Sequence, residues 1–335
     1  MATYKGIKGV KVVTKTSDPT ASEAAGTVWY NSTSPTALKY AIQSAAAWAS
    51  GDSLNVASKS GGAAGSSNSA ALSFGGEIPP SDTVTGNTES YNGSAWTEVN
   101  NLTTARHTFM SAGSSTAALA SGGYTGTVYS ANSEDWDGTS WTEGNNMTQN
   151  YGYAAGAGTT TAAFITGGLY PPGTKINSTF EWNGSSWTAG GNLGTARESL
   201  RATGTLTAGL AAGGESGGPP ATIPTATEEY DGSSWTAGGA MNTAKSKFNM
   251  SGAQTSGLSY GGNAPPLTVN TEAYDGSAWT EVANLATARI QMSAGSTNPT
   301  ANTAALCIGG STPPTVATVE EWADPSYTIK TVTVS

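Results

Sequence analysis

Few residues in this chain could carry acid–base, nucleophilic or metal chemistry. Among 335 residues there is one histidine, His107, and one cysteine, Cys307. A copper site with two histidine ligands is therefore excluded, as is an intramolecular disulfide. Cys307 lies in the apolar run 304–308, where we expect it to be a small buried side chain. The sequence thus predicts neither a metal nor another cofactor.

Acidic and basic side chains give no catalytic pattern either. A glycosidase needs only two carboxylates, but the acids that do not recur along the chain form no recognisable motif: Glu77, Asp82, Glu198 and Glu215. A sialidase would need an arginine cluster, and only four arginines are present. Three of these recur at one offset, namely Arg106, Arg197 and Arg289. We expect them to be structural and to pair with a strand glutamate or with loop carbonyls. No enzyme is predicted, with a glycosidase as the alternative.

The offset of these arginines belongs to a larger repeat, seen best in residues 228–236, Glu-Glu-Tyr-Asp-Gly-Ser-Ser-Trp-Thr. An aromatic residue precedes a tryptophan by five positions, with Asn-Gly or Asp-Gly between them. Asn-Gly and Asp-Gly are typical of β-hairpins with a type I′ turn, which needs positive φ at both central positions. We therefore expect a hairpin in each copy: residues 89–96, 134–141, 181–187, 228–235 and 272–279.

Gly-Gly pairs show the same period. They begin at residues 75, 122, 167, 213, 261 and 309, and each follows a short segment of small or apolar residues. A period in the mid-forties with four strand segments per repeat is the pattern of a β-propeller blade. The sequence thus predicts an all-β protein with six blades, in which Gly-Gly allows close approach between blades.

The full pattern resembles the kelch repeat. It reads Gly-Gly, Glu-x-Tyr-Asp-Gly, Trp and then Asn-Leu-x-Thr-Ala-Arg, as at residues 101–106, 192–197 and 284–289, and it covers about residues 59–334. The resemblance implies a kelch-like β-propeller. The second repeat lacks the arginine, the fourth has Lys245 in its place, and the sixth lacks the Asp-Gly turn and its tryptophan.

Residues 1–50 differ from the repeats, and we expect a short β arm there, followed by the propeller in residues 51–335. Residues 26–33 together with 38–40 resemble an element near the start of bacteriophage tail-fibre and other virion proteins. The resemblance implies a non-catalytic virion structural protein whose arm docks on the particle. The residues expected to form this anchor are Tyr4, Lys5, Lys8, Lys11, Trp29 and Tyr30.

Charge and hydropathy are consistent with that expectation. The formal net charge is −9, which disfavours binding to nucleic acid. Neither a signal peptide nor an apolar run of membrane-spanning length is found, so we expect a virion protein made in the host cytoplasm, without membrane insertion. The expected partners are other virion proteins, through residues 1–50, further copies of the chain within the particle, and a host glycan or receptor. Tail fibre, tail tip and capsid decoration remain alternative positions.

Binding residues are expected in the loops that follow Gly-Gly. Five of these loops carry a proline pair, a stiff apolar surface that could meet a partner or simply rigidify the loop: Pro79-Pro80, Pro171-Pro172, Pro219-Pro220, Pro265-Pro266 and Pro313-Pro314. The second repeat instead has Tyr124 and Tyr129, which with Tyr170 could stack on a sugar ring in a lectin-like site. Ordinary loop packing is the alternative for these tyrosines.

Two closures of the sixth blade are open. The alternating segment 327–334 could complete the blade and leave residues 28–48 outside the ring, which is the closure we expect. Alternatively, Trp48 marks an N-terminal strand that takes this place, since it precedes Lys59 by nearly the same distance as Trp96 precedes Arg106.

Overall fold

The structure, a computed structural model, describes residues 12–19, 27–33, 37–293, 302–324 and 327–332. It divides the chain into two compact units, Met1–Ala47 with Ala323–Ser335, and Trp48–Trp322. These are called the small unit and the large unit below. Every regular element in the described residues is a β-strand, and none of them is a helix. The boundaries differ from the expected division at residue 50, because both ends of the chain belong to the small unit.

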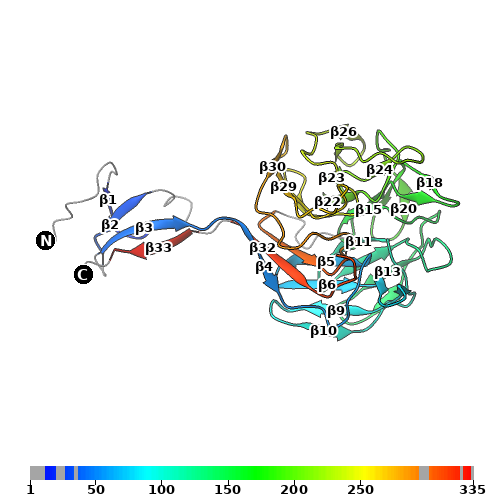
Figure 1. The fold of residues 1–335 in the computed structure, drawn as a ribbon, viewed down its shortest axis with the longest axis horizontal. Helices are drawn as coiled ribbons and strands as arrows, with labels where there is room; N and C mark the ends of the chain where they lie inside the picture. The colour runs from blue at the N-terminus through cyan, green and yellow to red at the C-terminus, as the bar shows by residue number, and fades with distance from the viewer. Residues whose placement is uncertain (1–11, 20–26, 34–36, 294–301, 325–326, 333–335) are drawn as a thin grey trace. The chain divides into compact units, whose positions relative to one another are not determined.

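Five four-stranded antiparallel sheets follow one another along the large unit (Figure 1). In each sheet consecutive strands pair with their neighbours. The sheets are β5 (Gly62–Ser67), β6 (Ala70–Phe74), β9 (Thr88–Tyr91) and β10 (Trp96–Val99); β11 (Met110–Gly113), β12 (Ala118–Ser121), β13 (Ser133–Trp136) and β14 (Trp141–Glu143); β15 (Ala155–Gly158), β16 (Ala163–Thr166), β19 (Thr179–Trp182) and β20 (Trp187–Ala189); β22 (Arg201–Thr205), β23 (Ala208–Ala212), β25 (Thr227–Tyr230) and β26 (Trp235–Ala237); and β27 (Asn249–Ala253), β28 (Ser256–Tyr260), β29 (Thr271–Tyr274) and β30 (Trp279–Glu281).

The recurring Asn-Gly and Asp-Gly segments connect the third and fourth strands, so the predicted hairpins are confirmed. The predicted type I′ turn is wrong. In the fourth sheet Tyr230 pairs with Trp235, so four residues form the loop, and Gly232 has positive φ but Asp231 does not. Instead, Asp231 Oδ1 accepts the backbone N–H groups of Ser233 and Ser234 at 2.8 Å. The aspartate is repeated because its carboxylate caps the turn, not because of its own φ angle.

The Gly-Gly pairs lie where two neighbouring sheets come close, as predicted. A Cβ atom on Gly75 would lie 2.7 Å from the Arg106 carbonyl oxygen, and one on Gly76 would lie 2.5 Å from that of Lys59. Both glycines also have positive φ. A side chain at Gly75 would therefore push two sheets apart, and one at Gly76 would displace the segment that leads into β5.

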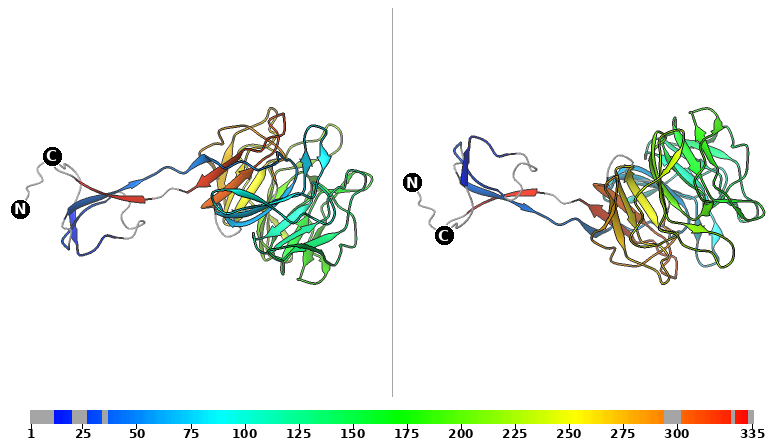
Figure 2. Two further views of the ribbon diagram at one scale, coloured as in Figure 1. Left: turned by 90° about the horizontal axis from the view of Figure 1, so that it is seen from below. Right: turned by 90° about the horizontal axis from the view of Figure 1, so that it is seen from above.

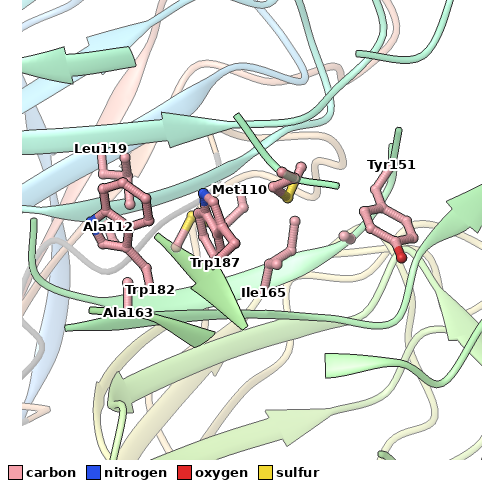
Figure 3. Close-up of a cluster of buried hydrophobic side chains, with 10 residues drawn as sticks. Met110, Ala112, Leu119, Tyr151, Ala163, Ile165, Trp182 and Trp187 are labelled. Atoms are coloured by element: carbon pink, nitrogen blue, oxygen red, sulfur yellow. The ribbon is translucent and has the colours of Figure 1, made fainter. Parts of the chain in front are cut away.

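Apolar clusters fill the space between successive sheets. Figure 3 shows one, in which Trp182 and Trp187 of the third sheet pack with Met110 and Leu119 of the second. An equivalent cluster joins Leu306 and its neighbours near the end of the large unit to the first sheet. Tryptophans and tyrosines at the start of the fourth strand and the end of the third thus supply much of the buried apolar area.

The recurring arginines are structural, as predicted. They lie buried and bind a glutamate of the third strand: Arg106–Glu134 at 2.9 Å, Arg197–Glu228 at 2.6 Å and Arg289–Glu320 at 2.7 Å. Each also donates to loop carbonyls, such as Arg106 to Asn132 O at 2.7 Å. Where the chain has Lys245 instead, its Nζ donates to Asn270 Oδ1 at 3.0 Å and stays 3.9 Å from Glu272.

The last sheet of the large unit corrects our expectation for the chain end. It contains β31 (Ala304–Ile308), β32 (Val319–Ala323) and, beside β32, the early strand β4 (Ala47–Gly51) (Figure 1). The expected completion by residues 327–334 is wrong, because β33 (Tyr327–Thr331) pairs with β3 (Ala37–Gln43) in the small unit. The alternative based on Trp48 is the one that the structure contains.

The small unit is a four-stranded sheet in the order β1–β2–β3–β33, with β1 (Val12–Lys15) parallel to β2 (Val28–Asn31). Figure 2 shows the red strand β33 beside the blue β3. Among its described residues, Trp29 and Leu38 are the buried apolar side chains. Asp18 joins its strands by accepting hydrogen bonds from Trp29 Nε1 at 3.2 Å and Lys39 Nζ at 2.6 Å.

Candidate functional site

Six residues share an unusual backbone conformation, and five of them lie just before the first strand of a four-stranded sheet. They have φ between 52° and 59°, in the left-handed region, although none is glycine. We call them the backbone ring: Ser60, Thr108, Tyr153, Ser199, Lys247 and Gln291. Such strain in a non-glycine residue persists only where the surrounding structure imposes it.

Hydrogen bonds join these residues into a closed cycle. Each donates its backbone N–H to the carbonyl of the ring residue in the preceding sheet, and Ser60 completes the cycle by donating to Gln291 at 2.6 Å. The other five bonds measure 2.8 to 3.0 Å. Five sheets and the segment around Gln291 thus meet at one point.

Side chains next to the backbone ring, together with those of two ring residues, form a surface around it. In each repeat, the residue before the ring residue forms a bridge with the residue after Gly-Gly, for example Lys59 with Glu77 and His107 with Tyr124. Glu198 and Glu215 occupy the same two positions in β21 (Arg197–Glu198) and β24 (Glu215–Ser216). We call the following side chains the ring face: Lys59, Glu77, His107, Tyr124, Tyr129, Tyr153, Glu198, Glu215 and Lys247.

Three carboxylates of the ring face are largely buried. Glu77 lies 3.8 Å from His107 Nδ1, Glu198 lies 3.4 Å from Lys175 Nζ, and Glu215 lies 3.3 Å from Lys247 Nζ. Burial raises the pKa of both Glu77 and Glu198. These groups can accept hydrogen bonds from the hydroxyl groups of a ligand.

Tyrosines flank the carboxylates. The rings of Tyr124 and Tyr129 lie 5.2 Å apart, and Tyr129 lies over Gly152, where an added Cβ would be 2.7 Å from the tyrosine ring. Burial, followed by the charge of Glu198, raises the pKa of Tyr129. Within the described residues, the phenol hydroxyls of Tyr124, Tyr129 and Tyr153 make no hydrogen bond. They can therefore bind a ligand without breaking an existing contact.

His107 is a neutral side chain at pH 7. Burial, with the charge of Lys59 in addition, lowers its pKa to about 4. Its Nδ1 atom is buried and has no hydrogen-bond partner in the part of the chain that the structure describes. The Nδ1 atom can form one hydrogen bond with a ligand. At neutral pH the uncharged imidazole does not attract an anion.

The structure brings together only some of the predicted binding residues. Tyr124 and Tyr129 contact each other, whereas Tyr170 packs against Tyr151, with ring centroids 6.3 Å apart. The proline pairs lie in the loops beyond the ring face, for example Pro79-Pro80 between β7 (Glu77–Ile78) and β8 (Thr83–Val84), and Pro171-Pro172 between β17 (Leu169–Tyr170) and β18 (Thr174–Lys175). Nearly all of these prolines are exposed: Pro79, Pro80, Pro172, Pro219, Pro220, Pro265, Pro266, Pro313 and Pro314.

The predicted anchor is only partly described. Tyr4, Lys5, Lys8 and Lys11 lie outside the described residues. Trp29 is 1% exposed and belongs to the packing of the small unit, so the structure does not support its use as a docking side chain. Tyr30, on the same strand, is half-buried.

Sequence reasoning missed the carboxylates and the histidine of this site. Glu77 and Glu215 each follow a Gly-Gly pair, and His107 and Glu198 each follow a structural arginine. Aligning the repeats on these two offsets would have placed Glu77 with Glu215 and His107 with Glu198.

Neither a protein-family model nor a curated protein sequence gives a significant match to this chain. The described residues contain no group of three or more His, Cys, Asp or Glu side chains arranged to hold a metal ion. Among those residues, no helix is long and apolar enough to cross a membrane.

Proposed function

We propose that the large unit is a six-bladed, kelch-like β-propeller and that the protein is a non-catalytic virion component that recognises a host surface. The cycle of backbone hydrogen bonds among Ser60, Thr108, Tyr153, Ser199, Lys247 and Gln291 supports six repeats around one axis. The apolar cluster between the last and first sheets supports closure. Tryptophan contacts support the same count, because Trp48 donates to Thr271 Oγ1 at 3.2 Å as Trp279 donates to Thr227 Oγ1 at 3.0 Å.

The two-unit organisation supports an attachment role. The small unit contains both ends of the chain, and the large unit is inserted between β3 and β33. One unit can therefore be held in an assembly while the other presents a surface. The resemblance of residues 26–33 to virion proteins favours a particle as that assembly.

The ring face is the surface that we propose to bind the ligand, and the observation that carries this is the convergence of Tyr124, Tyr129 and Glu198 where the repeat is broken. Aromatic rings stack on the apolar face of a sugar, and carboxylates accept its hydroxyl hydrogens. Lys59, Lys175 and Lys247 each already lie beside a carboxylate, so among the described residues these lysines are not free to bind a phosphate or sulfate. The ligand class is therefore a neutral carbohydrate.

The full-length chain on a glycan array tests this proposal. Neutral oligosaccharides should bind, and Tyr129→Ala or Glu198→Gln should weaken binding at least about tenfold, which corresponds to about 1.4 kcal/mol. Tyr170→Ala is the matched control, because this exposed tyrosine lies against Tyr151 instead. Equal loss in the control, or no binding to any neutral glycan, contradicts the proposed ligand. Hydrolysis of a bound glycan contradicts the non-catalytic role and favours a glycosidase.

The virion role is tested by locating the chain in intact particles. Antibodies raised against the large unit should label particles at their surface by electron microscopy. A chain lacking residues 1–44 and 325–335 should no longer join particles, while circular dichroism reports whether its strands are retained. A deletion extending to residue 50 is unsuitable because it removes β4 from its sheet. Normal incorporation of the shortened, folded chain contradicts the proposed anchor.

A further inference from the structure

A small cavity lies directly at the backbone ring. Its volume is about 20 Å³, and it is lined by all six ring residues together with Phe109, Ala154 and Arg201. A volume of this size holds about one water-sized particle. The carboxylates Glu77, Glu198 and Glu215 are not among its lining residues.

Arg201 differs from the other arginines of the chain. Arg106, Arg197 and Arg289 each bind a glutamate within 2.9 Å. Within the described residues, Arg201 forms no ion pair, and its Nε atom is buried without a hydrogen-bond partner. Its one hydrogen bond runs from Nη1 to the carbonyl oxygen of Leu200, at 2.9 Å.

The position of Arg201 also breaks the repeat. It is the first residue of β22, and the first residues of the equivalent strands β5, β11, β15 and β27 are Gly62, Met110, Ala155 and Asn249. Scaffold packing therefore does not require an arginine here, because four other repeats form the same strand without one.

Arg201 is partly buried, its Nε atom is fully buried, and no opposite charge lies beside the guanidinium among the described residues. Burial lowers the pKa of Arg201 to about 10, so the group remains protonated at pH 7. Lys247, which also lines the cavity, already lies 3.3 Å from Glu215. A charge that is partly removed from water without a partner is unfavourable, and a bound counter-ion relieves that cost.

A second hydrogen-bond donor lines the same cavity. The Oγ1 atom of Thr108 is buried and has no partner among the described residues. A hydroxyl can donate one hydrogen bond to an anion, as can the Nε–H of Arg201. The two side chains come from the second and fourth sheets, so an anion held between them would link sheets that are not adjacent.

We propose that this cavity is a binding site for one monatomic anion of chloride size, held by Arg201 and Thr108. A sulfate or phosphate, with four oxygens around a central atom, is too large for a cavity that holds one water-sized particle. The site shares Tyr153 and Lys247 with the ring face but does not depend on which ligand that face recognises, and its role is to stabilise the point where the sheets meet.

Thermal unfolding of the full-length chain in sodium chloride and in sodium gluconate, at equal ionic strength, tests the site. Gluconate is too large to enter, so chloride should raise the unfolding temperature by on the order of 2–4 °C. Arg201→Met should abolish this difference. Lys175→Met is the control, because this lysine pairs with Glu198 outside the cavity and its loss should leave the chloride effect intact.

Anomalous diffraction from a crystal soaked in sodium bromide tests the wild-type site directly, even if Arg201→Met does not fold. A bromide peak within hydrogen-bond distance of the Arg201 guanidinium and Thr108 Oγ1 supports the proposal. Peaks at the protein surface alone, or an equal effect of chloride and gluconate on the wild-type chain, overturn it and leave water as the occupant of the cavity.

Discussion

His107 is the chain's only histidine, and its buried ring packs edge-on against Tyr124 and Tyr153. Its pKa is lowered to about 4 by burial, from an ordinary value near 6.5. The unfolded chain therefore takes up this proton at a higher pH than the folded protein does. Above pH 6.5 the group is neutral in both states, and below that pH its protonation favours unfolding.

We expect the free energy of unfolding to fall as the pH decreases from 6.5 to 4, by at most about 1.4 kcal/mol per pH unit from this residue. Urea unfolding of wild type and His107→Gln between pH 4 and 7 measures it as the difference in slope. The raised pKa of Glu77 acts in the opposite sense, and comparison of the two proteins separates the contributions. An imidazole NMR titration with a midpoint near pH 6.5 would contradict the lowered pKa.

The structural arginines are residues whose role could be predicted from the repeat. Their pairing with glutamates follows from one fixed offset per repeat, so it could be predicted from the sequence. The ring-face carboxylates Glu77 and Glu198 are far apart in the chain and occupy different positions of their repeats, so no local pattern joins them. Their placement around the backbone ring depends on the closed cycle of hydrogen bonds, a feature that only the structure shows.

At the scale of strands, β4 is the element that pairs farthest from its place in the sequence of the large unit. It is the outer strand of a sheet whose other strands begin at Ala304. Its Trp48 packs against Tyr260 and Trp322, with ring centroids 4.8 and 5.5 Å apart. The side chain therefore takes the place held elsewhere by the hairpin tryptophans.

Trp48→Ala should lower the free energy of unfolding of the large unit by about 2–4 kcal/mol, since it removes a large aromatic side chain from a packed site. Trp48→Phe should lower it by less, because it keeps most of the ring packing and loses mainly the hydrogen bond to Thr271. Urea unfolding followed by circular dichroism compares the three proteins. Equal midpoints for wild type and Trp48→Ala would show that β4 does not stabilise the sheet.

Local turn chemistry explains why the hairpins could be predicted and the pairing of β33 could not. An Asp-Gly loop between an aromatic residue and a tryptophan determines its own two strands within a few residues. The alternating residues of β33 favour a strand but do not specify its partner, and pairing with β3 spans almost the whole chain. The spacing of Trp48 from Lys59 was the only local sign of the correct closure.

At the scale of the whole molecule, the protein combines a large unit with many buried aromatic residues and a small unit with few. The small unit depends on Trp29, Leu38 and the hydrogen bonds of Asp18. Small domains bury a lower fraction of their surface and are correspondingly less stable. The two units should therefore unfold separately.

Differential scanning calorimetry of the full-length chain should show two transitions, with the small unit unfolding at the lower temperature. Trp29→Ala should remove the lower transition, because loss of a buried tryptophan costs about 3–5 kcal/mol, a large part of the stability of any small domain. The upper transition should stay unchanged. A single transition that shifts as a whole in Trp29→Ala would contradict independent unfolding.

The position of β4 has a consequence for how the protein is made. During translation β4 leaves the ribosome before every other strand of the large unit, whereas its partner β32 leaves last. The sheet that joins them cannot form until β32 has been synthesised, and the apolar surface of the first sheet remains uncovered until then. A prematurely terminated chain therefore yields an open, aggregation-prone product instead of a smaller working version.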